Sequence, residues 1–293
     1  MTDSFLTRIL GELQNISAGE RLAFIKAEIS KIDDPDQREL AETALFLGMS
    51  VGAPVPREHV VVLVHGIRTY AEWQERLAGA LTDKGHENVY PVGYGFFDVL
   101  SFLCPIWTRR RPIDRVLREF RAIKTKHRDA DISVVAHSFG TYILSQILED
   151  ATDVSLHRVI LCGCIVPLKF RWDKVMARVK GVVINEVGTL DYWPVIARLV
   201  TWGYGASGTF GFKTSFVRDR FHNCGHSDFF EDDLMSKYWL PMLLDGQVVP
   251  SDWTRTRSRS SALVSFLSWL PLKSLLLIGA VTGVAVFAMH RVA

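Results

Sequence analysis

The stretch DISVVAHSFGTYIL, residues 131–144, changes its pattern within a few residues. Residues 131–137 are mostly apolar and β-branched, as in a strand, and the β-branched run at residues 60–64 suits a strand that is buried on both faces of a sheet. A helical pattern follows from Thr141 to Leu148. Ser138 lies between the two, and Gly140 allows the strand and the helix to approach each other closely. The stretch therefore predicts an abrupt strand-to-helix turn that presents a hydroxyl group.

Short apolar runs of the same kind alternate with helical patterns along much of the chain. We expect strands at residues 60–64, 88–94, 131–137, 158–163, 181–187 and 215–221, and helices at 112–127 and 141–148. Such alternation indicates an α/β fold, with a mostly parallel sheet covered by helices on both faces. Ligands of such sheets gather at the carboxyl ends of the strands, which is where Ser138 is expected to lie.

Length and composition divide the 293 residues into four segments. Residues 1–52 are predicted to form a helical extension, in which Asp34 caps a helix that begins at Pro35. Whether this extension packs or docks a partner is left open. The predicted segments that follow are the α/β domain at 53–250, a basic tether at 251–261 and a transmembrane segment at 262–293.

Charge and cysteine content exclude several classes of protein. A net charge of +2 argues against a dedicated nucleic-acid binder. The four cysteines do not form a C-x-x-C pair, which leaves a zinc site without support and predicts reduced thiols in the cytosol. We expect neither a metal nor another cofactor. The cysteines are Cys104, Cys162, Cys164 and Cys224.

The C-terminal part of the chain has the composition of a membrane span. Between Ala262 and Met289, Lys273 is the only charged residue. A span from about Trp269 to Met289 matches the roughly 20 apolar residues that a bilayer requires, with the Lys273 side chain reaching back to the interface. The alternative is a helix buried at the C-terminal end of the α/β domain.

Residues around this segment predict its orientation and a possible contact between copies. Three arginines precede the span, which places the α/β domain in the cytoplasm by the positive-inside rule. Gly279 and Gly283 form a G-x-x-x-G pair, whose spacing permits a homodimer through close contact of two helices. The arginines are Arg255, Arg257 and Arg259.

The turn at Ser138 resembles the nucleophile elbow of the α/β-hydrolase family. Residues 136–140, Ala-His-Ser-Phe-Gly, match the G-x-S-x-G motif with alanine in place of its first glycine. The His-Gly-Ile sequence at 65–67 follows an expected strand, as a His-Gly pair does in the family. The resemblance covers about residues 58–245 and implies the α/β-hydrolase fold with Ser138 as nucleophile. The alternative role for Ser138 is to cap the helix.

The same resemblance suggests groups around the nucleophile. It implies an oxyanion hole formed by the backbone N–H groups of Ile67 and Phe139, with Arg68 as a less favoured donor or substrate contact. His65 would support the loop. His137, next to the nucleophile, is expected to point elsewhere.

The family order is nucleophile, then acid, then histidine, and the chain offers residues in that order. Asp191 follows the strand expected at 181–187, where the family places its acid, and Asp173 is the reserve candidate. Glu186 lies within that strand and is less well placed. His226 is the expected base, with His222 as its alternative.

These features together suggest a membrane-anchored serine hydrolase that cleaves carboxylic esters, of the esterase or lipase type. Residues 95–111, with apolar residues followed by Arg109, Arg110 and Arg111, form either an interfacial patch for lipid or a buried segment. Residues 167–180 and 192–213 flank the expected site and are candidates for a lid. The alternatives are a thioesterase on acylated protein or carrier, a non-catalytic scaffold, and a membrane-perturbing effector.

Overall fold

The computed structural model describes residues 8, 9, 12, 16, 18–39, 41, 58–66, 72–93, 102, 104, 108–253, 266, 273–275, 278, 279, 282 and 283. The chain divides into two compact units, Met1–Arg57 and Glu58–Ala293. Among the described residues, no helix has the length and apolar character needed to cross a membrane. Most of the span expected within 262–293 lies outside the described residues, as do Ile67 and Arg68.

The N-terminal unit is helical where it is described. Helix α2 covers Ala18–Ile29, and residues 35–39 form a further helical turn. The Asp34 carboxylate accepts hydrogen bonds from the backbone N–H groups of Asp36 and Gln37 at 3.0 and 3.4 Å, which confirms the predicted cap. A small apolar cluster holds this unit together and comprises Ile9, Phe24, Ile25 and Ile29.

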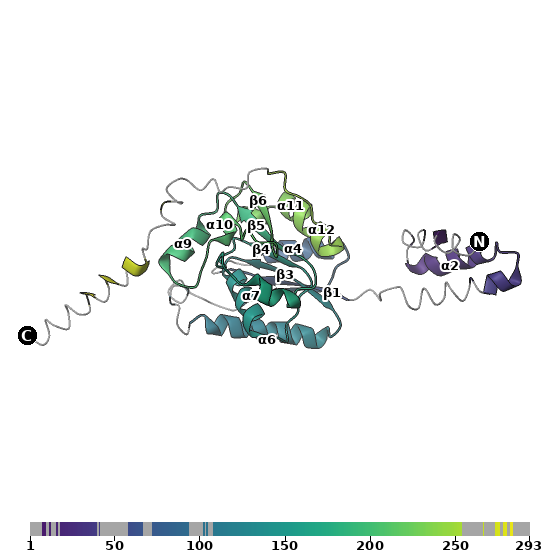
Figure 1. The fold of residues 1–293 in the computed structure, drawn as a ribbon, viewed down its shortest axis with the longest axis horizontal. Helices are drawn as coiled ribbons and strands as arrows, with labels where there is room; N and C mark the ends of the chain where they lie inside the picture. Colours follow the sequence, from purple (N-terminus) through teal and green to yellow (C-terminus); the bar gives the residue numbers. More distant parts are fainter. Residues whose placement is uncertain are drawn as a thin grey trace, which may run out of the picture. The chain divides into compact units, whose positions relative to one another are not determined.

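The second unit is built on a sheet of six strands, in which every pairing is parallel (Figure 1). The strands are β1 His59–Val64, β2 Val89–Val92, β3 Asp131–His137, β4 Val159–Cys162, β5 Val183–Gly188 and β6 Arg218–His222. Their spatial order is β2-β1-β3-β4-β5-β6. This arrangement confirms the predicted parallel sheet, although several strand ends differ by a few residues from those expected.

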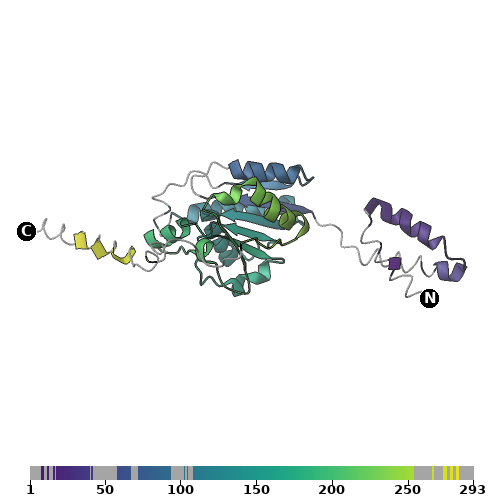
Figure 2. The ribbon, with the colours of Figure 1, turned by 90° about the horizontal axis from the view of Figure 1, so that it is seen from above.

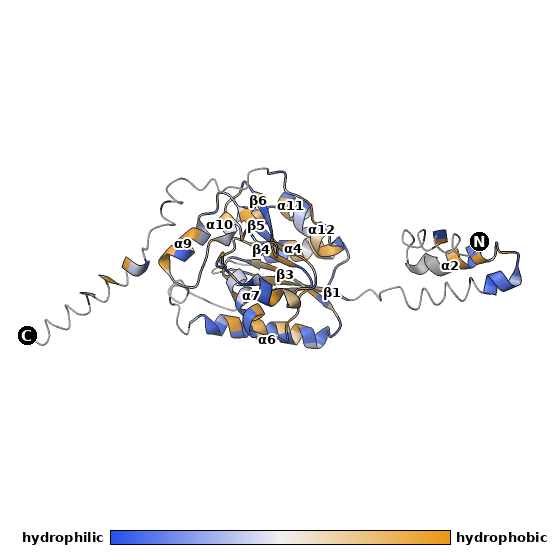
Figure 3. Ribbon diagram, in the orientation of Figure 1, coloured by the Kyte–Doolittle hydropathy of each residue, from blue (hydrophilic) through white to orange (hydrophobic). Residues whose placement is uncertain are grey.

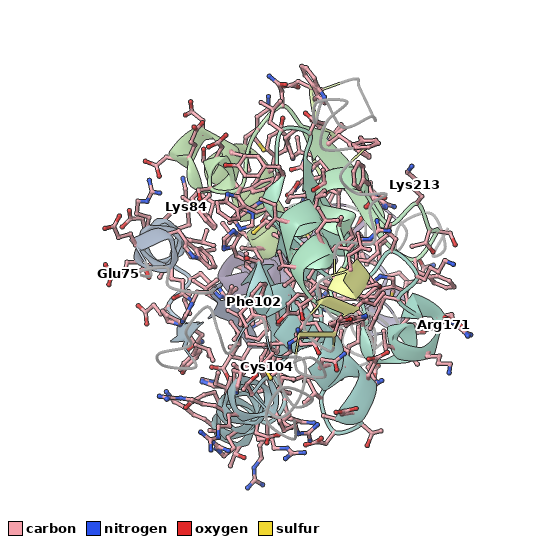
Figure 4. The ribbon with its side chains drawn as sticks, turned by 90° about the vertical axis from the view of Figure 1, so that its left-hand side faces the viewer. Glu75, Lys84, Phe102, Cys104, Arg171 and Lys213 are labelled. Carbon is pink, nitrogen blue, oxygen red and sulfur yellow. The ribbon has the colours of Figure 1, made fainter. Side chains whose placement is uncertain are left out.

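Helices cover both faces of this sheet (Figures 1 and 2). One layer contains α6 Arg110–Lys126, α7 Phe139–Asp150, α8 Trp172–Val175 and the 3-10 helix Met176–Arg178. The other contains α4 Glu72–Thr82, the 3-10 helix Asp228–Phe230, α11 Asp232–Leu234, the π-helix Met235–Trp239 and α12 Leu240–Asp245. Helices α9 Trp193–Val200 and α10 Ser207–Phe210 follow β5. In an end-on view, Glu75 of α4 and Arg171 beside α8 lie on opposite sides (Figure 4).

The two apolar cores follow from the alternation of side chains along the strands. In β1, Val60, Val62 and Val64 belong to the core under α6 and α7, whereas Val61 and Leu63 belong to the core under α4 and α12. All five side chains are fully buried. The mainly apolar colouring of the central strands, between helices that carry hydrophilic residues, agrees with this (Figure 3). The predicted burial of this strand on both faces is therefore confirmed.

A buried charged network ties the last two strands to the second helical layer. Glu186 on β5 accepts hydrogen bonds from Arg220 Nε at 2.9 Å and from His222 Nε2 at 2.7 Å, both on β6. It also accepts one from Trp239 Nε1 at 2.9 Å. Burial raises the pKa of Glu186, but the hydrogen bonds and charges of Arg220 and His222 outweigh it and lower that pKa to about 2. This carboxylate therefore stays ionised.

Replacing Glu186 with Gln should lower the free energy of unfolding at neutral pH by about 3–5 kcal/mol, because Arg220 would keep a buried charge without its anion. The pKa of Glu186 is about 2 in the folded chain against 4.5 for the free side chain. The stabilisation is therefore complete above pH 4.5 and is lost as the pH falls towards 2.

Denaturant unfolding at neutral and at acidic pH measures this difference. Glu119→Gln, on the exposed face of α6, is the matched control and should change stability by less than about 0.5 kcal/mol. A difference between wild type and Glu186→Gln that does not shrink on acidification would contradict the assignment.

Candidate active site

Ser138 occupies a sharp turn between β3 and α7. Its φ of 53° and ψ of −119° lie in a region that residues with a side chain rarely adopt. The turn is held by backbone bonds, since the Ser138 N–H donates to Cys162 O at 3.0 Å and Ser138 O accepts from the Thr141 N–H at 3.0 Å. The Ser138 side chain makes no capping hydrogen bond to α7, so the capping role considered from the sequence is not found.

Close packing at this turn explains the small residues around it. A Cβ atom on Gly140 would lie 2.7 Å from the carbonyl oxygens of Val64 and His65, at the end of β1. A Cβ on Gly66 would lie 2.8 Å from Ser138 Cβ. The His-Gly pair that follows β1 is thus seated directly against the Ser138 turn, and any larger residue at either glycine would push the two apart.

Asp191 and His226 come together although they lie on different loops. His226 Nδ1 lies 2.9 Å from Asp191 Oδ2, in hydrogen-bond geometry. The Asp191 side chain is fully buried and also accepts a hydrogen bond from the Trp193 backbone N–H at 3.0 Å. The His226 side chain remains 17% exposed. A buried carboxylate that accepts the Nδ1 proton fixes the neutral tautomer of the imidazole and leaves Nε2 as a proton acceptor.

The His226 ring lies near the Ser138 turn. A Cβ on Gly163 would lie 2.6 Å from His226 Cε1. Gly163 directly follows Cys162, whose carbonyl accepts the Ser138 N–H. Within the described part of the chain, Ser138 Oγ makes no hydrogen bond to His226. Hydroxyl, imidazole and carboxylate therefore gather at the carboxyl ends of neighbouring strands.

The alternative acids and base have other partners. Asp173 is exposed on α8 and pairs with Arg171 at 2.6 Å. His222 and Glu186 belong to the buried network between β5 and β6. His222 and Glu186 therefore stabilise the fold and Asp173 lies at its surface, whereas Asp191 and His226 are hydrogen-bonded to each other.

His137 is a residue of the site that sequence analysis placed elsewhere. Its ring centroid lies 4.6 Å from that of His226, and its Nε2 lies 3.2 Å from His226 O, in hydrogen-bond geometry. Burial first, and then the charge of His226, lower the pKa of His137 well below its usual range, so it stays neutral. Side chains alternate between the two faces of a strand, so His137 lies on the same face of β3 as Val135. This alternation is the sequence signal that could have indicated the position of His137.

Arg109 holds together two loops beside α7. It is 4% exposed and donates hydrogen bonds to Trp202 O at 2.7 Å and Thr201 Oγ1 at 3.1 Å. Its guanidinium also lies 3.9 Å from the centre of the Tyr204 ring. Of the two alternatives left open for residues 95–111, contact with anionic lipid does not fit Arg109, because its side chain is buried and bound internally. Most of the apolar residues before it lie outside the described residues.

Two further expectations concern the groups around the nucleophile. Phe139 is the first residue of α7, where the helix dipole favours negative charge. Its role in an oxyanion hole stays a prediction, and its expected partner Ile67 lies outside the described residues. Among the residues that are described, no three His, Cys, Asp or Glu side chains are grouped so as to hold a metal ion.

No protein-family model matches the chain. No curated protein matches it with significance either.

Gly163→Ala should destabilise the fold more than Gly85→Ala. Both glycines have a positive φ, 53° and 82°, which costs a residue with a side chain about 1–2 kcal/mol. No atom lies within 4 Å of a Cβ on Gly85, whereas at Gly163 the added methyl would strike His226. We expect a further loss of about 1–3 kcal/mol at Gly163 from this overlap. Denaturant unfolding of both variants measures it, and equal losses would mean that the imidazole is not seated against Gly163.

Proposed function

We propose that the protein is a membrane-anchored serine hydrolase of the α/β-hydrolase type, which cleaves carboxylic esters through an acyl-enzyme. The observation that carries the proposal is the hydrogen bond between His226 and the buried Asp191, at the sheet edge that also holds the strained Ser138 turn. The order of these residues along the chain, the parallel sheet and the glycine-lined elbow support the same family type.

The proposed reaction uses each of these groups in turn. Ser138 Oγ attacks the carbonyl carbon of the ester while its proton passes to His226 Nε2. Asp191 stabilises the resulting imidazolium, and backbone N–H groups, with Phe139 as one donor, stabilise the oxyanion. The bond to the alcohol then breaks, and His226 returns the proton to the leaving oxygen. Water, deprotonated by His226, attacks the acyl-enzyme and releases the carboxylic acid.

A fluorophosphonate probe tests the proposed nucleophile. The full-length chain should be labelled at Ser138, and Ser138→Ala should abolish labelling. Asp191→Asn should slow labelling by about a thousandfold or more, because the imidazole would lose the tautomer that leaves Nε2 free. The exposed Asp173→Asn is the matched control and should label at the wild-type rate. A folded wild-type chain that never labels would favour the non-catalytic scaffold.

The substrate class can be tested in cells that express either wild type or Ser138→Ala. If the substrate is a membrane lipid, wild type should produce more of a free fatty acid and the matching lysolipid, and lipid mass spectrometry measures both. Unchanged lipids together with deacylated protein or carrier would indicate the thioesterase instead.

A further inference from the structure

A group of large apolar side chains is exposed beside the candidate active site. Ten such side chains are exposed in the described part of the chain, and six of them lie on or next to α9, with exposures of 37–51%. We call these six the α9 surface. Monomeric soluble proteins seldom leave such a cluster uncovered unless it contacts a partner or a membrane. Its residues are Leu190, Tyr192, Trp193, Ile196, Val200 and Trp202.

Helix α9 is apolar on two sides. Val195 and Leu199 are buried and pack against Ala206. Ile196 and Val200, which are spaced at i and i+4, point the other way and are exposed. Burying one side against the domain thus leaves a second apolar side that the described residues do not cover.

The α9 surface is continuous with the rim of the candidate active site. The Trp193 backbone N–H donates to Asp191, and the Trp193 ring centroid lies 6.4 Å from that of His226. Tyr192 stacks on Trp193 at 5.4 Å between centroids. Whatever covers this surface therefore lies beside the imidazole.

Lys273 connects the same surface to the C-terminal apolar segment. Its Nζ lies 3.5 Å from Arg198 O and 5.8 Å from the centre of the Trp202 ring. Residues 274–289, which follow it directly, contain no charged residue. If these residues enter a bilayer, the contact with Lys273 brings α9 to the surface of that same bilayer.

We propose that the α9 surface docks in the headgroup region of the phospholipid bilayer that the C-terminal span enters, so that ester substrates reach Ser138 from the membrane. This inference rests on the proposed function and names the source of its substrate. Tyrosine and tryptophan rings favour the membrane interface, and the half-buried Arg198 and Lys273 are the cations of the same region, which anionic headgroups would attract. A second copy on this surface would instead bring the arginines and lysines of two chains together.

Spin labels in the full-length chain test the docking directly. The chain, with the half-buried Cys104 replaced by serine, carries a nitroxide at Ile196→Cys and is reconstituted in vesicles of equal parts phosphatidylcholine and phosphatidylglycerol. The label should be accessible to oxygen and protected from a water-soluble nickel complex. A label at Ala122→Cys, on the exposed side of α6, is the matched control and should show the reverse.

Two results of this experiment would overturn the proposal. The first is an Ile196→Cys label in vesicles that is as accessible to nickel as the Ala122→Cys label. The second is an Ile196→Cys label that is protected from oxygen as well as from nickel, which would assign the surface to a contact with protein.

The rate of ester hydrolysis provides an independent test of docking. Ile196→Asp combined with Val200→Asp should lower hydrolysis of vesicle phospholipid by about tenfold or more, since two carboxylates would have to enter the headgroup region. Hydrolysis of a water-soluble acetate ester should be unchanged. Phe216→Asp is the matched control, because Phe216 is exposed just before the amino end of β6, away from the site.

The two proposals fail in different ways. Equal loss on both substrates, or no loss on phospholipid, would contradict docking. A wild-type chain that hydrolyses neither substrate would contradict the proposed function, and the spin labels would still decide the docking.

Discussion

The buried carboxylate of Asp191 is the constraint on which the candidate site depends. A carboxylate shielded from water must be compensated by hydrogen bonds or by charge. Asp191 satisfies this requirement with the Trp193 backbone N–H at the start of α9 and with His226 in the loop after β6. One buried group thus fixes the orientation of the imidazole, sets the position of α9 and joins two loops that are distant in the chain. The neutral His137 adds support, since its ring packs against that of His226.

Because the strands of the sheet are parallel, residues that follow successive strands in the sequence come close together in space. Strands β3, β4, β5 and β6 follow one another in the sequence and are neighbours in space. Because they are parallel, the segments that leave their carboxyl ends emerge at one edge. Ser138 leaves β3, Gly163 leaves β4, Asp191 follows β5 and His226 follows β6. Each residue needs only a short loop to reach the others, so the site requires no unusual path of the chain.

The sequence could predict the sheet because its signals are local. Runs of β-branched residues indicate strands such as β1 and β3, and the turn at Ser138 needs only the small residues on either side of it. The sequence could not predict the partners of each charged group, because these partners depend on contacts between residues that are distant in the chain. Asp191 and Asp173 both follow expected strands, and only the fold buries one and exposes the other. The same limit applies to Arg109, because two of its acceptors, Thr201 and Trp202, lie about ninety residues further along the chain.

Two histidine–carboxylate pairs lie close together in this fold, and their surroundings separate their roles. His222 and Glu186 are both nearly inaccessible, and the carboxylate is also held by Arg220, so this pair is enclosed within the sheet and the helices that cover it. His226 keeps 17% of its side chain exposed, while its carboxylate is fully buried. An imidazole with one covered nitrogen and one open side can exchange a proton with a bound molecule, and a fully enclosed one cannot. Exposure of the imidazole, more than the strength of its hydrogen bond, therefore distinguishes the pair suited to chemistry from the pair that stabilises the sheet.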